Sequence, residues 1–240
     1  MIITATNLKN NLGEYLRAAA REDIIITSNG RKVARLSAYE DEKTTCGSVK
    51  ETAKDYEVWP RKATYEEFVA LWENSEERYE YIDGEIYLLS SPRVAHQQAL
   101  GKLYTMLFDW FSGKKCTPFF APFDITLKRN AESTNIVQPD LMVICDLEEN
   151  INEKDYYMGV PSLVVEILSE SSRSKDSVKK LDLYMSTGVR EYWIVNTIHK
   201  QVNVFSFENC EVVENITYKN DEKLVSFLFE GLEISLKDIF

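Results

Sequence analysis

Two carboxylates in this chain stand at or inside short apolar runs, where an unpaired charge is costly. Asp140 lies within the run at residues 136–144, and Glu166 lies inside the run at residues 163–168. Both runs are short and rich in β-branched residues, which predicts buried strands. A buried carboxylate is strongly destabilising unless a cation or hydrogen bonds replace its lost water. Two such groups on neighbouring strands predict a shared hard cation, for which Mg²⁺ is the natural candidate and Mn²⁺ the alternative.

A helical pattern at residues 171–187 follows the second run and supplies a cation. Its apolar residues recur at helical spacing, and we expect them to face the core: Val178, Leu181 and Met185. Gly188 is placed where a glycine commonly ends a helix. Lys180 lies on a different stripe of the helix, from which its ammonium would reach the end of the Glu166 strand. The neighbouring Lys179 serves as the comparison, because an isolated helix lysine is usually a solvated surface charge.

Several ordered motifs share the pattern of one known family. They are Arg78-Tyr79-Glu80-Tyr81-Ile82-Asp83-Gly84-Glu85, Ser91-Pro92 followed by His96, Pro139-Asp140, Glu166, Lys180-Leu181, Tyr184, and Gly188-Val189 with Glu191-Tyr192-Trp193. From about residue 64 to residue 240 the chain resembles the Uma-type restriction endonuclease family, a branch of the PD-(D/E)XK nuclease fold. The resemblance implies an α/β (α+β) domain with a restriction-endonuclease-like mixed sheet flanked by helices.

The resemblance also implies an enzyme and a set of roles. The activity would be that of a Mg²⁺-dependent DNA endonuclease, a hydrolase of phosphodiester bonds, in which Asp140 and Glu166 hold the metal. Glu80 would be a further catalytic carboxylate on the metal side, and His96 would position a neighbouring group. Lys180 would stabilise charge in the transition state or orient the attacking water.

One departure keeps a second function open. The usual Glu-x-Lys motif of this fold would place its lysine at position 168, where this chain has Leu168. The family resemblance implies that the lysine has moved to the following helix, which makes Lys180 the candidate. The alternative is a catalytically silent DNA-binding or regulatory protein that retains the nuclease fold. Taken alone, Pro139-Asp140 is also typical of a turn.

The elements that must position these residues follow from local patterns. Thr64 and Glu67 form a capping-box signature for a short helix that reaches residue 72. Asp83-Gly84 predicts the turn of a hairpin at residues 79–90. The remaining expected elements are a helix at 94–111, strands at 118–127, 136–144, 163–168 and 191–195, and edge strands at 201–205 and 211–216.

Composition bounds the class of protein. The chain has 240 residues, of which 44% are hydrophobic and 28% charged, as in an ordinary globular protein. We see no membrane span and no signal peptide, and the four cysteines show no metal-binding spacing, so we expect a reduced, cytoplasmic setting. Two histidines exclude catalysis that depends on several imidazoles. A net charge of −11 argues against tight, purely charge-driven binding of nucleic acid.

Residues 1–45 form a separate pattern, joined by a polar linker at 46–60 to the domain at 61–240. A strand, an amphipathic helix and a hairpin around Asn29-Gly30 give a β-α-β-β module. It resembles the N-terminal half of Phd/YefM antitoxins, which implies a homodimer, DNA docking and a toxin-antitoxin-type partner. A module of this size buries too little to be stable alone, which also favours dimerisation.

Charge favours the small module as the part that contacts DNA. Residues 1–45 hold seven basic and six acidic residues, a net of +1, whereas the rest holds 21 basic and 33 acidic ones, a net of −12. The candidate phosphate contacts are Lys9, Arg31, Lys32 and Arg35. The alternative interpretation is that these four residues are solvated surface charges.

Overall fold

The structure is a computed structural model that describes residues 2–4, 7–8, 15, 18–19, 24–28, 31–36, 60–131, 133–168 and 174–240. The chain divides into two compact units, Met1–Tyr56 and Glu57–Phe240. Among the described residues, no helix is both long and apolar enough to cross a membrane.

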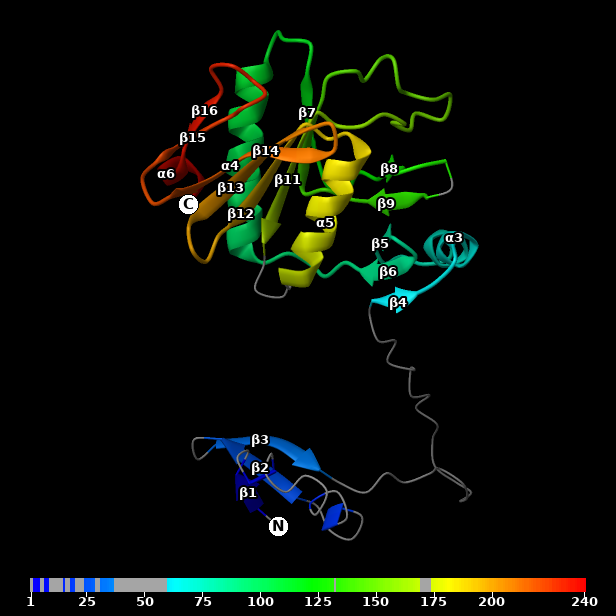
Figure 1. Cartoon of the computed structure of the whole chain (residues 1–240), viewed down its shortest axis with the longest axis vertical. Coiled ribbons are helices and arrows are strands. Elements are labelled where there is room, and N and C mark those ends of the chain that lie inside the picture. The colour runs from blue at the N-terminus through cyan, green and yellow to red at the C-terminus, as the bar shows by residue number, and fades with distance from the viewer. Residues whose placement is uncertain are drawn as a thin grey trace. The chain divides into compact units, whose positions relative to one another are not determined.

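The larger unit is built on a six-stranded mixed sheet (Figure 1). Its strand order is β14, β13, β12, β11, β10, β7, and only β11 and β12 run parallel to each other. The strands are β7 (Thr117–Phe120), β10 (Leu141–Ile144), β11 (Leu163–Leu168), β12 (Glu191–Asn196), β13 (Gln201–Glu208) and β14 (Glu211–Lys219).

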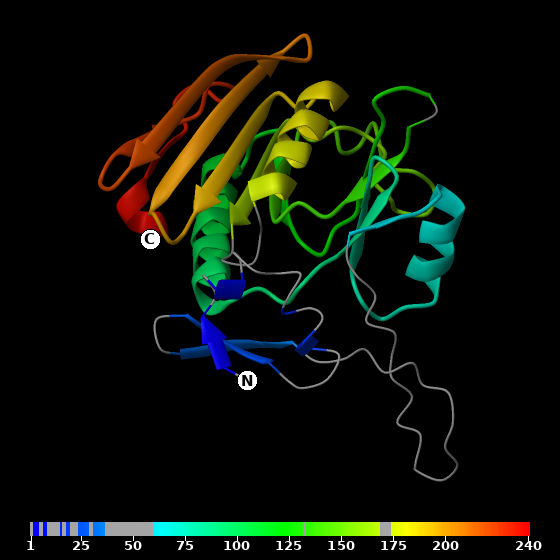
Figure 2. The same cartoon turned by 60° about the horizontal axis from the view of Figure 1, so that its bottom comes forward.

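Two helices cover the opposite faces of this sheet. Helix α4 (Val94–Phe111) packs on one face, and α5 (Ser174–Thr187) packs on the other (Figures 1 and 2). Alternation along the strands divides the side chains between the two cores. In β11, Leu163, Val165 and Ile167 face α4, whereas Val164 packs in the core below α5. Glu166, two residues after Val164, therefore projects towards α5.

A second, five-stranded sheet has the order β4, β6, β5, β9, β8. Its strands are β4 (Arg61–Lys62), β5 (Tyr79–Ile82), β6 (Glu85–Leu88), β8 (Ile125–Leu127) and β9 (Asn135–Val137). Helix α3 (Tyr65–Glu73) packs on it through Phe68, and the predicted capping box between Thr64 and Glu67 is confirmed. The predicted hairpin turn is confirmed as well, since Asp83 and Gly84 have φ of 49° and 78°.

The sequence analysis predicted one continuous strand at 118–127 and another at 136–144. Both predictions were wrong, because each run forms two strands. The runs at 118–127 and 136–144 each leave one sheet and enter the other, giving β7 with β8 and β9 with β10. Pro122 and Pro139 lie in the two breaks, where a residue without an N–H is tolerated because the ladder is interrupted there. Apolar residues continue on both sides of each break, because β8, β9 and β10 are buried and β7 is partly buried, so hydrophobicity alone did not reveal the breaks.

The C-terminal segment closes the unit with β15 (Lys223–Val225), β16 (Glu233–Ser235) and the short helix α6 (Leu236–Ile239). Cys116 and Cys145 form a disulfide, contrary to our expectation of reduced cysteines. The two cysteines are 29 residues apart, so the sequence alone did not indicate that they pair. β7 and β10 are antiparallel neighbours, and the two cysteines continue the register by one position beyond the Thr117–Ile144 pair.

The smaller unit contains β1 (Ile2–Thr4), β2 (Ile24–Ser28) and β3 (Arg31–Leu36). β1 pairs parallel with β2, and β2 pairs antiparallel with β3, as expected for the predicted hairpin. Of the predicted phosphate contacts, Lys9 lies outside the described residues. Arg31, Lys32 and Arg35 lie in β3, but their side chains are not among those described.

Candidate active site

A pocket of about 420 Å³ lies where the two sheets of the larger unit meet. It brings together four of the residues that the sequence singled out for catalysis or metal binding: Glu80, Asp140, Glu166 and Lys180. His96 also lines it. Glu80 comes from β5, Asp140 from the break before β10, Glu166 from β11 and Lys180 from α5. The site therefore draws on both sheets and one helix.

Strand register places Asp140 beside Glu166. β10 and β11 pair antiparallel with Leu141 opposite Val165, so Asp140 and Glu166 occupy the next position of the same ladder. Directly opposite residues of an antiparallel pair project to the same face of a sheet. Both carboxylates consequently line the same pocket, and Asp140 is held there because the Ile167 N–H donates to its Oδ2 over 2.7 Å.

His96 supplies the second contact of that Asp140 oxygen. Its Nε2 lies 3.1 Å from Asp140 Oδ2, and the ring is buried at the beginning of α4. Burial by itself would lower the pKa of His96, but the hydrogen bond and the charge of Asp140 outweigh it and raise that pKa above its usual value. The geometry fits the sequence-based expectation that His96 positions a neighbouring group.

Lys180 lies between two acids. Its Nζ donates to Glu80 Oε1 over 2.8 Å and to Glu166 Oε1 over 2.9 Å. The Lys180 side chain is 13% exposed, and those of Glu80 and Glu166 are 3% and 12% exposed, so the pairing is largely removed from water. Tyr184 OH also donates to Glu166 Oε1, over 2.7 Å, and the Gln138 N–H donates to Glu80 Oε1 over 2.9 Å.

Burial and charge set the protonation states in this cluster. Burial is the main reason that the pKa of Glu166 is raised to about 7; the Lys180 ammonium opposes the rise, and the Asp140 and Glu80 charges add to it. Burial would lower the pKa of Lys180, but the charges of Glu166 and Glu80 hold it well above its usual value. Lys180 therefore remains an ammonium, which suits an electrostatic role and not that of a general base.

The donor set suits a hard divalent cation that keeps much of its water. From the part of the chain that the structure describes, Asp140 and Glu166 each receive all their hydrogen bonds on one oxygen, Oδ2 and Oε1, which leaves the other oxygen of each available. The same described residues contain no cluster of three His, Cys, Asp or Glu side chains arranged to hold a metal ion. Mg²⁺ commonly takes only one or two carboxylates and completes its shell with water and phosphate oxygens, so the two carboxylates fit it.

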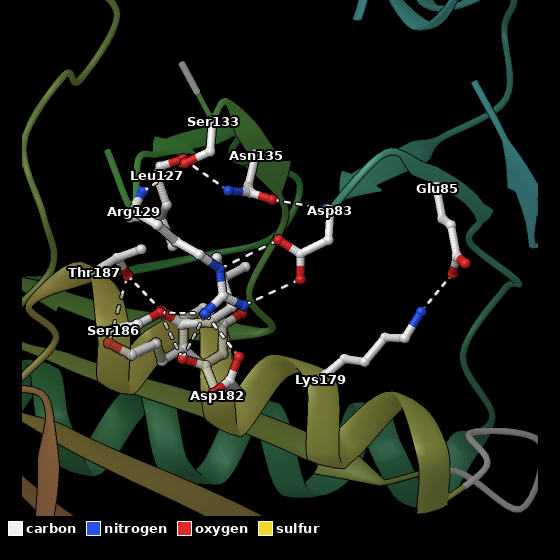
Figure 3. Close-up of polar contacts among 12 residues, drawn as sticks. Asp83, Glu85, Leu127, Arg129, Ser133, Asn135, Lys179, Asp182, Ser186 and Thr187 are labelled. Carbon is white, nitrogen blue, oxygen red and sulfur yellow. Dashed lines mark hydrogen bonds and ion pairs between the residues drawn. The ribbon is translucent and has the colours of Figure 1, made fainter. Parts of the chain in front are cut away.

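Lys179 also lines the pocket, but it pairs with a different acid from those that hold Lys180. Its Nζ pairs with Glu85 (Figure 3). It also donates to Tyr87 OH over 2.7 Å, so Lys179 ties α5 to the β5–β6 hairpin. The two adjacent lysines have different partners because of the way α5 packs on the sheet. Our expectation that Val178, Leu181 and Met185 form its core face was wrong in part: Val178 is 65% exposed, and the fully buried residues are Leu183 and Tyr184. Lys180 lies three and four residues before that pair, so it shares their buried side.

Arg129 holds the other end of α5, which the sequence did not indicate. Its guanidinium pairs with Asp83 over 3.1 Å and with Asp182 over 2.7 Å, and it also donates to Ser186 Oγ (Figure 3). Asp83 is fixed in turn because its N–H donates to Asn135 Oδ1. The hairpin turn and α5 are thus joined on both sides of Lys180. The sequence marked Asp83 as part of a turn and of a family motif, but it did not indicate the contact with Arg129, which lies 46 residues away.

Comparisons with known proteins bear on the family and the fold of the chain. A family model described as "Uma2: Putative restriction endonuclease" matches residues 65–237, and one for the Phd_YefM antitoxin of type II toxin-antitoxin systems matches residues 1–44. An uncharacterized Synechocystis protein, slr1290, is 26% identical over 145 residues, which cover 60% of this chain and 74% of that protein.

A solved structure from Anabaena variabilis, described as "a putative nuclease belonging to DUF820", has a TM-score of 0.60 and 20% identity to this chain. The match covers 73% of this chain and 96% of that one. At this identity the likeness is evidence of fold, and it confirms the predicted restriction-endonuclease-like α+β architecture.

Proposed function

Since the chain belongs to the Uma2 family of restriction-endonuclease-like nucleases, we propose that it is a Mg²⁺-dependent endonuclease that hydrolyses phosphodiester bonds in DNA. The observation that carries this proposal is the convergence of Asp140, Glu166 and the Lys180 ammonium on one pocket. Two carboxylates with a buried lysine are the groups that phosphodiester hydrolysis needs: oxygen ligands for a metal and a fixed positive charge.

Each residue has a defined task in this proposal. Asp140 and Glu166 would hold the cation, which when bound would polarise a phosphoryl oxygen and lower the pKa of an attacking water. Lys180 would stabilise the negative charge that develops on the phosphoryl group. Glu80 acts through Lys180, because it accepts a hydrogen bond from the same ammonium that donates to Glu166. His96 and Tyr184 keep Asp140 and Glu166 in place, because each donates one hydrogen bond to its carboxylate.

Lys180 also bears on the missing motif lysine. Leu168 occupies the position where the fold usually has lysine. The ammonium of Lys180, which comes from α5, nevertheless donates to the Glu166 carboxylate. This observation favours an active nuclease over a catalytically silent DNA-binding protein.

The test is cleavage of supercoiled DNA by the full chain with Mg²⁺, Mn²⁺ or EDTA. We expect nicking or linearisation only with a divalent ion and none from Glu166→Gln. Lys180→Ala should lower the rate by roughly 10²-fold, as expected for the loss of an electrostatic stabiliser, whereas Lys179→Ala should change it little. Equal effects of the two lysine substitutions would contradict the assignment of Lys180. A folded wild-type protein that cleaves neither DNA nor RNA would favour the silent, DNA-binding alternative.

We further propose the organisation of the chain around this activity: residues 1–45 as a dimerisation and DNA-docking module, 46–60 as a linker and 61–240 as the nuclease domain. The antitoxin match at residues 1–44 supports the first assignment. Lys9, Arg31, Lys32 and Arg35 remain the candidate phosphate contacts there, and a toxin-antitoxin-type partner and a cytoplasmic location fit the same match.

A further inference from the structure

Arg78 is a pocket-lining cation to which the catalytic proposal gives no task. It borders the pocket with Glu80 and the other site acids, and its side chain is partly exposed. The two pocket lysines have acid partners, since Lys180 pairs with Glu80 and Glu166 and Lys179 pairs with Glu85. Arg78 has no ion pair with any acid among the residues that the structure describes. It therefore brings a charge to the pocket that no described side chain neutralises.

The β5–β6 hairpin fixes the position of Arg78 relative to the pocket. Arg78 directly precedes β5, and its carbonyl oxygen accepts from the Leu89 N–H over 2.9 Å, which extends the ladder by one step. Residues two apart on a strand project to the same side, about 6.6 Å from each other. Arg78 thus lies on the same side as Glu80, one such step further along the strand, and the next step in the other direction, Ile82, lines the same pocket.

The chemistry of the site explains why such a cation is needed. Three carboxylates face the pocket, in a unit that carries most of the acidic charge of the chain, so a nucleic-acid backbone meets a repulsive field beside the site. An arginine fork binds phosphate oxygens in a bidentate manner and stays charged at every relevant pH. Placed one step from Glu80, it would engage a phosphate near the one that is cleaved and not the catalytic centre itself.

We infer that Arg78 is a substrate-binding residue that contacts a backbone phosphate of the nucleic acid next to the scissile phosphate. The inference rests on the proposed nuclease function and deepens it, because it states how the strand is held across the pocket. A phosphate contact carries no base information, so Arg78 sets position and affinity and leaves sequence preference to other groups.

The test measures binding without cleavage, using full-length Asp140→Asn as the parent. Fluorescence anisotropy with a fluorescein-labelled DNA duplex, at about 50 to 200 mM NaCl, gives the affinity and its salt dependence. Arg78→Gln should weaken binding roughly ten-fold and reduce the slope of log K against log salt by about 0.9, the value for one lost phosphate contact on duplex DNA. Arg78→Lys should keep most of the slope, because it keeps the charge.

Lys237→Gln is the control, since Lys237 is an exposed lysine in α6 that pairs with Asp221 and does not line the pocket. It should leave slope and affinity unchanged. If the parent binds DNA and Arg78→Gln leaves both values as they were, the inference about Arg78 is wrong while the nuclease proposal stands. If Arg78→Gln weakens binding without changing the slope, or Arg78→Lys behaves like Arg78→Gln, the residue acts on structure and the inference is again overturned. If the parent does not bind DNA at all, the proposed function fails first.

Discussion

Replacing Lys180 and Lys179 in turn separates a buried ion cluster from a surface pair. Lys180→Met leaves Glu80 and Glu166, which are 3% and 12% exposed, without their cation. Removing one partner of a buried pair costs about 3–5 kcal/mol of unfolding free energy. Lys179 and Glu85 are 40% and 24% exposed, and an ion pair of that kind contributes about 0–1 kcal/mol. In metal-free buffer at pH 8, Lys180→Met should therefore be destabilised several-fold more than Lys179→Met.

The pH dependence follows from Glu166. Folding raises its pKa from 4.5 to about 7, so the folded state holds this proton more tightly than the unfolded chain. The stability linked to that proton is present below about pH 4.5 and is lost as the pH rises through about 7. Without Lys180 the ionised carboxylate has less support, and we expect the cost of Lys180→Met to be at least about 1 kcal/mol smaller at pH 5.5 than at pH 8. Adding Glu166→Gln should return part of the loss at pH 8.

The assay is urea unfolding in EDTA, followed by tryptophan fluorescence. All four tryptophans lie at position 59 or beyond, so the signal reports on the larger unit and not on residues 1–56. Equal costs for the two lysine substitutions at pH 8 would refute the reasoning, and so would a cost below about 1 kcal/mol for Lys180→Met.

Two further predictions concern the metal and the small module. Millimolar Mg²⁺ or Mn²⁺ should raise the melting temperature of the wild-type chain through ligand linkage, and Asp140→Asn should abolish the rise; an unchanged wild-type melting temperature would argue against a metal at Asp140 and Glu166. Deleting residues 1–45 should leave a folded nuclease domain with a lower oligomeric state, and light scattering that finds the same number of chains per particle would contradict a dimerisation role.

Much of the fold was predictable, because helix caps, turns and hydrophobic periodicity depend on residues that are close in sequence. The capping box at Thr64 and the hairpin turn at Asp83-Gly84 are of this kind. The breaks near Pro122 and Pro139 were not predictable, since the chain stays apolar while it changes from one sheet to the other.

The candidate site was predictable where a carboxylate lies inside an apolar run of the sequence, because such a carboxylate is expected to be buried and to need a partner. Glu166 stood out because it interrupts an apolar run, and strand adjacency then brought in Asp140. The partners that fix the cluster could not be found in this way. Arg129 contacts α5 across more than 50 residues of chain, and the N–H groups that hold Glu80 and Asp140 belong to the backbone, which has no sequence signature.

Those two backbone groups have a practical consequence. The amides of Gln138 and Ile167 donate to Glu80 Oε1 and Asp140 Oδ2, so each N–H bond lies in the electric field of a carboxylate of the site. A proton or a cation that arrives on either acid changes that field. The amide resonances of Gln138 and Ile167 in a nitrogen-15 correlation spectrum are therefore native probes of the site, which need no attached fluorophore near the pocket and no turnover.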